Sequence, residues 1–211
     1  MATTVWPVTL FTKAVAGDCA QVTPLIPAGA DAHALQARPG DLLALGRARA
    51  LVLNGLGLES GLQRLIQAAD NPHLVLIDSS RGIRTLRVSS SSEPSDHGHN
   101  QADGHDQADG DEHAHGHADA AGAINPHIWL DPLRAVQQVQ TIRDGLVQLD
   151  PACAAGYRRR AEAYITRLRA LHQDLAASLA PVRGRTFVAF HDVAPYFGQR
   201  YGLAAAFLVE A

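Results

Sequence analysis

Three well-separated histidines in this chain have the chemistry of metal ligands. His33 follows the loop PAGADA, His127 lies within NPHIWLDP, and His191 comes directly after the apolar run TFVAF. Neutral imidazole is the commonest zinc donor in proteins, and three ring nitrogens supply most of a tetrahedral shell. The separations of 94 and 64 residues are not a local metal-binding motif. Composition alone therefore leaves open the alternative of three ordinary surface histidines.

Six further histidines lie in a separate setting, the segment 89–122. This segment contains eight acidic residues, no Lys or Arg and almost no large apolar side chain. It cannot bury enough surface to offset an ordering entropy of roughly 1–2 kcal/mol per residue, so we expect a disordered insertion. Histidine-rich tracts bind zinc, nickel or copper weakly and at several points. We expect this low-affinity metal capture, with a solvated linker or a pH sensor as alternatives, at His97, His99, His105, His113, His115 and His117.

Short apolar runs alternate with helical periodicity through the rest of the chain, which predicts an α/β fold with parallel sheets. In such sheets ligands gather beyond the carboxyl ends of strands, where His191 is placed. We expect extended segments at 3–8, 20–26, 50–54, 73–78, 185–190 and from 204 onward. We expect helices at 9–17, from 39, and at 58–69, 132–149, 156–179 and 195–201.

These elements suggest two lobes joined by one long helix. We assign 1–150 to an N-terminal lobe with the insertion 89–122, 151–180 to the linking helix, and 181–211 to the start of a second lobe. We expect that second lobe to be incomplete in this chain, since its sheet has only begun at residue 211. The stripe of apolar residues in 156–179 spans about six helical turns, which suits a connector.

Composition excludes several classes of function. Outside the insertion 18 basic residues face 13 acidic ones, scattered without a basic stripe, so we expect no nucleic-acid partner. No window of 18 apolar residues exists, and the first residues lack the pattern of a signal peptide. Cys19 and Cys153 form no metal-spaced pair, and we expect thiols here rather than a disulfide.

Four motifs follow one another along the chain: GADAHALQARPGDLLALGRARALVLNGLGLES, IDSSRGI, NPHIWLDP and FHDVAPYFGQRYGL. Together they resemble the metal-binding solute receptors of zinc and manganese ABC importers. The stretch GADAHALQARPGDLLALGRARALVLNGLGLES resembles the first half of that family, with a ligand histidine, a Pro-x-Asp helix start and N-G-x-G-x-E. NPHIWLDP is similar to the second-ligand motif, and FHDVAPYFGQRYGL to the third. IDSSRGI before the insertion also fits, so the resemblance covers nearly the whole chain. Zinc-type members carry a His/Asp-rich loop at this point, whereas manganese-type members generally lack it.

The resemblance implies a metal ion in the cleft between the lobes, held by His33, His127 and His191. In the family a carboxylate from the second lobe often completes the shell, and here it would fall after Ala211. Some zinc members use an acidic residue just before the first histidine, but this chain has Ala32 there and Asp31 one step further back. Water, Asp31 or a residue beyond the chain therefore all stay open as the fourth ligand.

The implied function is binding rather than catalysis. A periplasmic, monomeric receptor would capture Zn²⁺ and deliver it to an ABC permease in the membrane. One alternative is a zinc buffer or metallochaperone acting through the loop. Another is a three-histidine zinc hydrolase, although the sequence has no HExxH motif and no paired carboxylates beside a ligand histidine.

Some other residues admit two interpretations. Asp192 either orients a ligand imidazole or caps the following helix. Glu59 is expected in the first turn of a helix, where the dipole favours it, rather than at the metal. His73 and His172 are expected to be structural or exposed.

Overall fold

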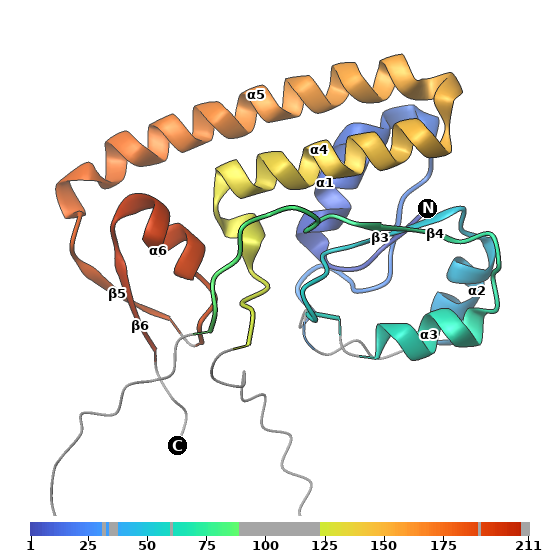
Figure 1. Cartoon of the computed structure of the whole chain (residues 1–211), viewed down its shortest axis with the longest axis horizontal. Coiled ribbons are helices and arrows are strands. Elements are labelled where there is room, and N and C mark those ends of the chain that lie inside the picture. Colours follow the sequence, from blue (N-terminus) through green and yellow to red (C-terminus); the bar gives the residue numbers. More distant parts are fainter. Residues whose placement is uncertain (31–32, 34–37, 60, 89–122, 190, 208–211) are drawn as a thin grey trace, which may run out of the picture.

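The computed structural model describes residues 1–30, 33, 38–59, 61–88, 123–189 and 191–207. The chain forms two parallel β-sheets flanked by helices, and one long helix runs from the larger sheet to the smaller one (Figure 1). The α/β class that the sequence predicts is therefore confirmed. None of the helices in these ranges is long and apolar enough to cross a membrane.

The larger sheet has four parallel strands in the order β2-β1-β3-β4. Ala2 aligns with Thr23 on one side and with Leu51 on the other, and Leu51 aligns in turn with Leu76. The strands are β1 (Ala2–Thr3), β2 (Thr23–Pro24), β3 (Ala50–Leu53) and β4 (Val75–Asp78).

Helices cover both faces of this sheet (Figure 1). Because successive strand residues point to opposite faces, neighbours in β3 enter different cores. Val52 packs with residues of α1 (Trp6–Ala16), α4 (Pro132–Leu149) and α5 (Ala154–Leu179). Leu51 packs with residues of α2 (Pro39–Arg47) and α3 (Leu62–Ala69).

The prediction of a strand over 3–8 was wrong beyond its first residue. Strand β1 ends at Thr3, and α1 begins at Trp6, with Pro7 in its first turn. Proline suits that position because its missing N–H would be unpaired there in any case. The β-branched residues suggested a strand, but the buried positions 8, 11, 12 and 15 follow a helical period. Helix α3 also begins later than predicted, at Leu62 rather than at residue 58.

Helix α5 connects the two sheets. Its buried residues, Tyr157, Ala161, Ile165 and Leu168, all lie in its first half, and Leu171 is already 46% exposed. The predicted apolar stripe thus packs against the first lobe only as far as residue 168. The helix then leads to β5 (Thr186–Ala189), α6 (Pro195–Tyr201) and β6 (Ala204–Phe207), and β5 and β6 pair in parallel.

The expectation of free thiols was also wrong. Cys19 and Cys153 form a disulfide with their Cα atoms 6.3 Å apart. The bridge links the short 3-10 helix after α1, Gly17–Cys19, to the one just before α5, Pro151–Cys153. It spans 134 residues of sequence, so only the packing of α1 against α5 brings the two cysteines within bonding range.

Candidate metal centre

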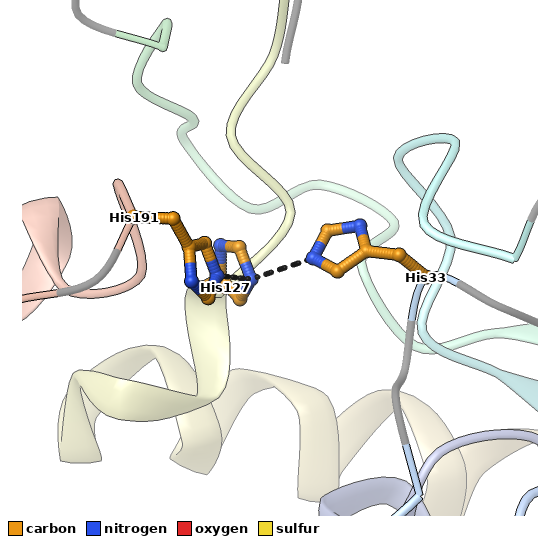
Figure 2. A group of neighbouring side chains, drawn as sticks. All are labelled: His33, His127 and His191. Carbon is orange, nitrogen blue, oxygen red and sulfur yellow. Dashed lines mark hydrogen bonds between the residues drawn. The ribbon is translucent and has the colours of Figure 1, made fainter. Parts of the chain in front are cut away.

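Three loops from distant parts of the sequence deliver the predicted histidines to one place. His33 lies in the loop after β2, His127 in the turn before α4, and His191 just after β5 (Figure 2). The Nε2 atom of His127 is 3.2 Å from Nε2 of His33 and 3.4 Å from Nε2 of His191. One nitrogen from each ring lies within 4.8 Å of the other two. The structure thus brings together all three residues that the sequence singled out.

These separations suit a single tetrahedral ion. Two nitrogens bound to one zinc at about 2.0–2.1 Å stand about 3.3–3.4 Å apart. The two Nε2–Nε2 distances, 3.2 and 3.4 Å, are close to that value. Among the described residues this is the one group of three or more His, Cys, Asp or Glu side chains that could hold a metal.

His127 is the central and most buried member of the group. Its side chain is almost fully enclosed, with 2% exposure, whereas His33 is half-buried and His191 is exposed. Burial, followed by the charges of His33 and His191, lowers the pKa of His127 to about 3. The ring is therefore neutral at pH 7, which is the state that binds a metal.

Asn125 is a contact of His127 that sequence reasoning missed. Its Oδ1 accepts the backbone N–H of His127 at 3.0 Å and lies 3.0 Å from Nδ1 of the same ring. Its Nδ2 donates to the backbone carbonyl of Asp192 at 2.6 Å. The repeated tripeptide Asn-Pro-His, at 71–73 and 125–127, was the available signal.

Asp131 holds the next turn in place. It is the N-cap of α4, which begins at Pro132 as predicted, and its Oδ1 accepts the N–H of Leu133 at 3.0 Å. The carboxylate is fully buried and binds Arg134 at 2.5 Å and Arg200 of α6 at 2.7 Å. Burial alone would raise the pKa of Asp131, but hydrogen bonds from Arg200, Leu133 and Arg134 and the charge of Arg200 hold it below its usual value.

Tyr196 joins α6 to the same region. Its hydroxyl donates to the carbonyl of Asn125 at 2.6 Å and accepts the N–H of Leu86 at 3.0 Å. The Arg134 guanidinium lies 4.5 Å from the centre of the Tyr196 ring. The loops that carry His127 and His191 are therefore tied together by hydrogen bonds and an ion pair that need no metal.

Glu59 does not occupy the first helical turn that was predicted, because α3 begins three residues later. Its buried carboxylate accepts bonds from the Thr4 hydroxyl and from the backbone N–H groups of Asn54 and Gly55. Burial raises the pKa of Glu59 in spite of these bonds. The Asn54 side chain in turn donates to the carbonyl of Pro126 at 3.0 Å, which helps to hold the turn that carries His127.

The remaining predicted residues have separate outcomes. Helix α6 has Ala194 at its N-cap with no side-chain cap bond, so the capping role considered for Asp192 was wrong. His73 is exposed, as expected, and His172 contacts the Tyr201 hydroxyl at 3.2 Å. Asp31 and the histidines of the insertion, His97, His99, His105, His113, His115 and His117, lie outside the described residues.

A separate concavity lies elsewhere on the molecule. It is a groove of about 580 Å³ between β4 and α4, lined by Val75, Ile77, Asp78, Thr141 and Gly145 among others. None of the three histidines lines it. The donor set, rather than the size of the cavity, therefore identifies the candidate site.

The model of a protein family, the zinc-uptake complex component A, periplasmic (ZnuA), matches residues 1–211. The chain belongs to the ZnuA family. It is 30% identical over 201 residues to the zinc-binding lipoprotein AdcA of Streptococcus pneumoniae serotype 4, which covers 95% of this chain and 37% of AdcA. It is also 30% identical over 190 residues to the manganese-binding lipoprotein MntA of Halalkalibacterium halodurans, which covers 89% of this chain and 53% of MntA.

A solved member of the family has the same fold. The crystal structure of ZnuA superposes with a TM-score of 0.76 at 30% identity, covering 97% of this chain and 69% of that one. The chain thus spans between about a third and about a half of the length of the two relatives, AdcA and MntA. The membership agrees with the resemblance found in the histidine motifs, and the names of the relatives include both zinc and manganese.

Proposed function

We propose that this chain captures Zn²⁺ between His33, His127 and His191 and passes it to an ABC-type permease in the membrane. The observation that carries this proposal is the spacing of the ring nitrogens, 3.2 and 3.4 Å about His127 Nε2. These distances match the edges of one tetrahedral zinc shell. Water, Asp31 or a residue outside the described chain supplies the fourth ligand.

The donor set favours zinc over manganese. Imidazole nitrogen suits zinc, whereas Mn²⁺ prefers carboxylate, carbonyl and water oxygens and is the weakest binder in the divalent series. The three imidazoles, of which His127 is held neutral by burial, supply nitrogen donors alone. Because relatives in the family are named for either metal, we base the choice of zinc on these ligands.

The compartment and the partner follow from the family and from the disulfide. Disulfides persist in oxidising environments outside the cytosol, so the Cys19–Cys153 bridge supports a periplasmic location. The family model describes a component of an uptake complex, which implies a permease as partner. We propose that the receptor acts as a monomer.

Two other functions for the same residues are less well supported. A hydrolase needs a general base beside the metal, but the carboxylate closest in sequence to His127, Asp131, is already bound to Arg134 and Arg200. A buffer acting through the insertion would not need the three converging histidines. Replacing these histidines therefore separates the receptor from the buffer.

Titration calorimetry of single variants tests the proposed site. His33→Ala, His127→Ala and His191→Ala are each expected to weaken the tight zinc-binding event by at least about 100-fold, because each removes one of three protein ligands. His73→Ala, which removes an exposed histidine from the same Asn-Pro-His tripeptide, is the matched control and keeps wild-type affinity. Tight binding that survives in all three site variants would support the buffer instead.

A further inference from the structure

The side-chain amide of Asn125 faces a metal-site residue on one side and the opposite lobe on the other. Asn125 is fully buried. Its Oδ1 contacts the backbone N and the ring Nδ1 of His127, and its Nδ2 donates to the carbonyl of Asp192, the residue after His191. The amide thus contacts the loops of two of the three histidines at once.

The partners determine which way this amide points. A backbone N–H can only donate and a carbonyl can only accept, so Oδ1 must face His127 and Nδ2 must face Asp192. A flipped amide would set two donors against each other at 3.0 Å and two acceptors at 2.6 Å. The orientation of the amide is therefore set by the chemistry of its partners.

The amide orientation in turn determines the tautomer of His127. Because Oδ1 can only accept, the ring must carry its proton on Nδ1. The lone pair of the neutral ring is then on Nε2, the atom that faces His33 and His191 (Figure 2). The opposite tautomer would direct a proton into the centre of the site.

We infer that Asn125 is a positioning residue that sets the His127 tautomer and aligns the His191 loop with it through a single amide. This inference rests on the proposed zinc site, because it explains how two lobes present their nitrogens in register. A residue that only shaped the turn would need no contact with the His127 ring or with Asp192. A purely structural role therefore predicts no change in the tautomer when Asn125 is replaced.

The chain contains a matched control for this role. Asn71 begins the other Asn-Pro-His tripeptide, and its Oδ1 accepts the backbone N–H of His73 at 3.1 Å in the same kind of turn. Its Nδ2 donates to the carbonyls of Leu45 and Ala48, which belong to the first lobe alone. Asn71→Ala therefore removes the equivalent hydrogen bond in a turn outside the metal site.

Long-range proton–nitrogen NMR on the metal-free protein measures the tautomer directly. In the wild type and in Asn71→Ala we expect His127 to be protonated at Nδ1 only. Asn125→Ala should raise the Nε2–H form and weaken zinc binding by about 10–100-fold in calorimetry. Asn125→Asp should restore the Nδ1–H form, because a carboxylate accepts the same bond, but it cannot donate to Asp192. Hydrogen exchange of the backbone amides in 191–194 should therefore rise in both Asn125 variants and not in Asn71→Ala.

The outcomes separate this inference from the proposed function. An unchanged tautomer and zinc affinity within twofold of wild type in Asn125→Ala would overturn the inference and leave the zinc site standing. Unchanged exchange in 191–194 would overturn the coupling to the second lobe. Failure of the histidine variants to lose zinc would overturn the proposed function, whereas the tautomer in the metal-free protein would still test Asn125.

Discussion

At the scale of the residue, the site depends on one imidazole that is kept neutral. His127 has 2% exposure and stands within 3.4 Å of both other histidine Nε2 atoms. A charged ring here would be desolvated and would face two like charges, so the folded protein resists its protonation. The burial that keeps the His127 ring neutral should therefore lower the stability of the metal-free folded protein at acid pH.

The stability of the metal-free protein should fall as pH falls below about 6.5. Above that pH His127 is neutral in both the folded and the unfolded chain. Below it the unfolded chain takes up a proton that the folded chain, with a pKa of about 3, does not, and this favours unfolding. The loss approaches about 1.4 kcal/mol per pH unit between these two pKa values.

Urea unfolding at pH 7.5 and 5.5 measures this effect. His127→Gln, which cannot titrate, should reduce the difference in unfolding free energy between the two pH values by about 1 kcal/mol. His73→Gln removes an exposed histidine and should keep the wild-type difference. An equal pH dependence in wild type and His127→Gln would show that burial of the ring is not linked to folding.

At the scale of the element, strand ends and helix starts position the three candidate ligands, and polar contacts hold them in register. The turn before α4 and the helix α6 come from opposite sides of the long helix α5 in sequence (Figure 1). They meet through Asp131 and Arg200, through Tyr196 and Asn125, and through Arg134 and Gln199. A site shared between two lobes can thus be arranged before the metal arrives.

Breaking the ion pair should loosen this arrangement. Arg200→Ala leaves the fully buried Asp131 without its bidentate partner, and we expect about 1–3 kcal/mol of lost unfolding free energy. Because the Arg200 side chain is 31% exposed, solvent screens the ion pair in part, and we expect a loss in the lower part of that range. Arg143→Ala breaks an ion pair with Asp144, whose side chain is 60% exposed, and should cost less than about 1 kcal/mol.

Denaturant unfolding and zinc titration distinguish the two variants. Arg200→Ala should also weaken zinc binding, because α6 and the His191 loop lose an anchor on the first lobe. If Arg143→Ala is as damaging as Arg200→Ala, the buried carboxylate has no special role.

At the scale of the whole molecule, the chain combines an ordered site with a histidine-rich insertion next to it in sequence. The insertion ends directly before the segment that leads to His127. A tethered weak binder raises the local metal concentration, and short flexible tethers give effective concentrations near the mM range. We therefore expect two classes of metal binding with separate structural origins.

Deletion of residues 89–122 tests this division. The tight zinc event should keep its affinity in calorimetry, while the additional weak events should disappear. Zinc binding from a dilute chelator-buffered solution should become slower, because the insertion would no longer raise the local zinc concentration. Loss of the tight event on deletion would mean that the insertion itself supplies ligands to the site.

Much of this protein could be predicted from local sequence patterns. Short continuous apolar runs that alternate with helical periodicity indicated the parallel α/β fold, since such a run is typical of a strand buried on both faces and the helical period of a helix packed on one side. Three histidines stood out because they follow loops or strand ends, where such folds bind ligands. The start of α1 was misjudged because β-branched residues such as Val5 and Val8 suit both a strand and the buried face of a helix.

Only the tertiary structure decided which residues pair over long distances. The Cys19–Cys153 bridge, the Asp131–Arg200 ion pair and the contact of Asn125 with Asp192 join residues 134, 69 and 67 positions apart. Sequence shows that such groups exist, but their pairing depends on distances and burial that arise once α4, α5 and α6 pack. The sequence by itself thus determined the types of the candidate ligands. The tertiary structure decided the distances between their nitrogens and the contact of the Asn125 amide with His127.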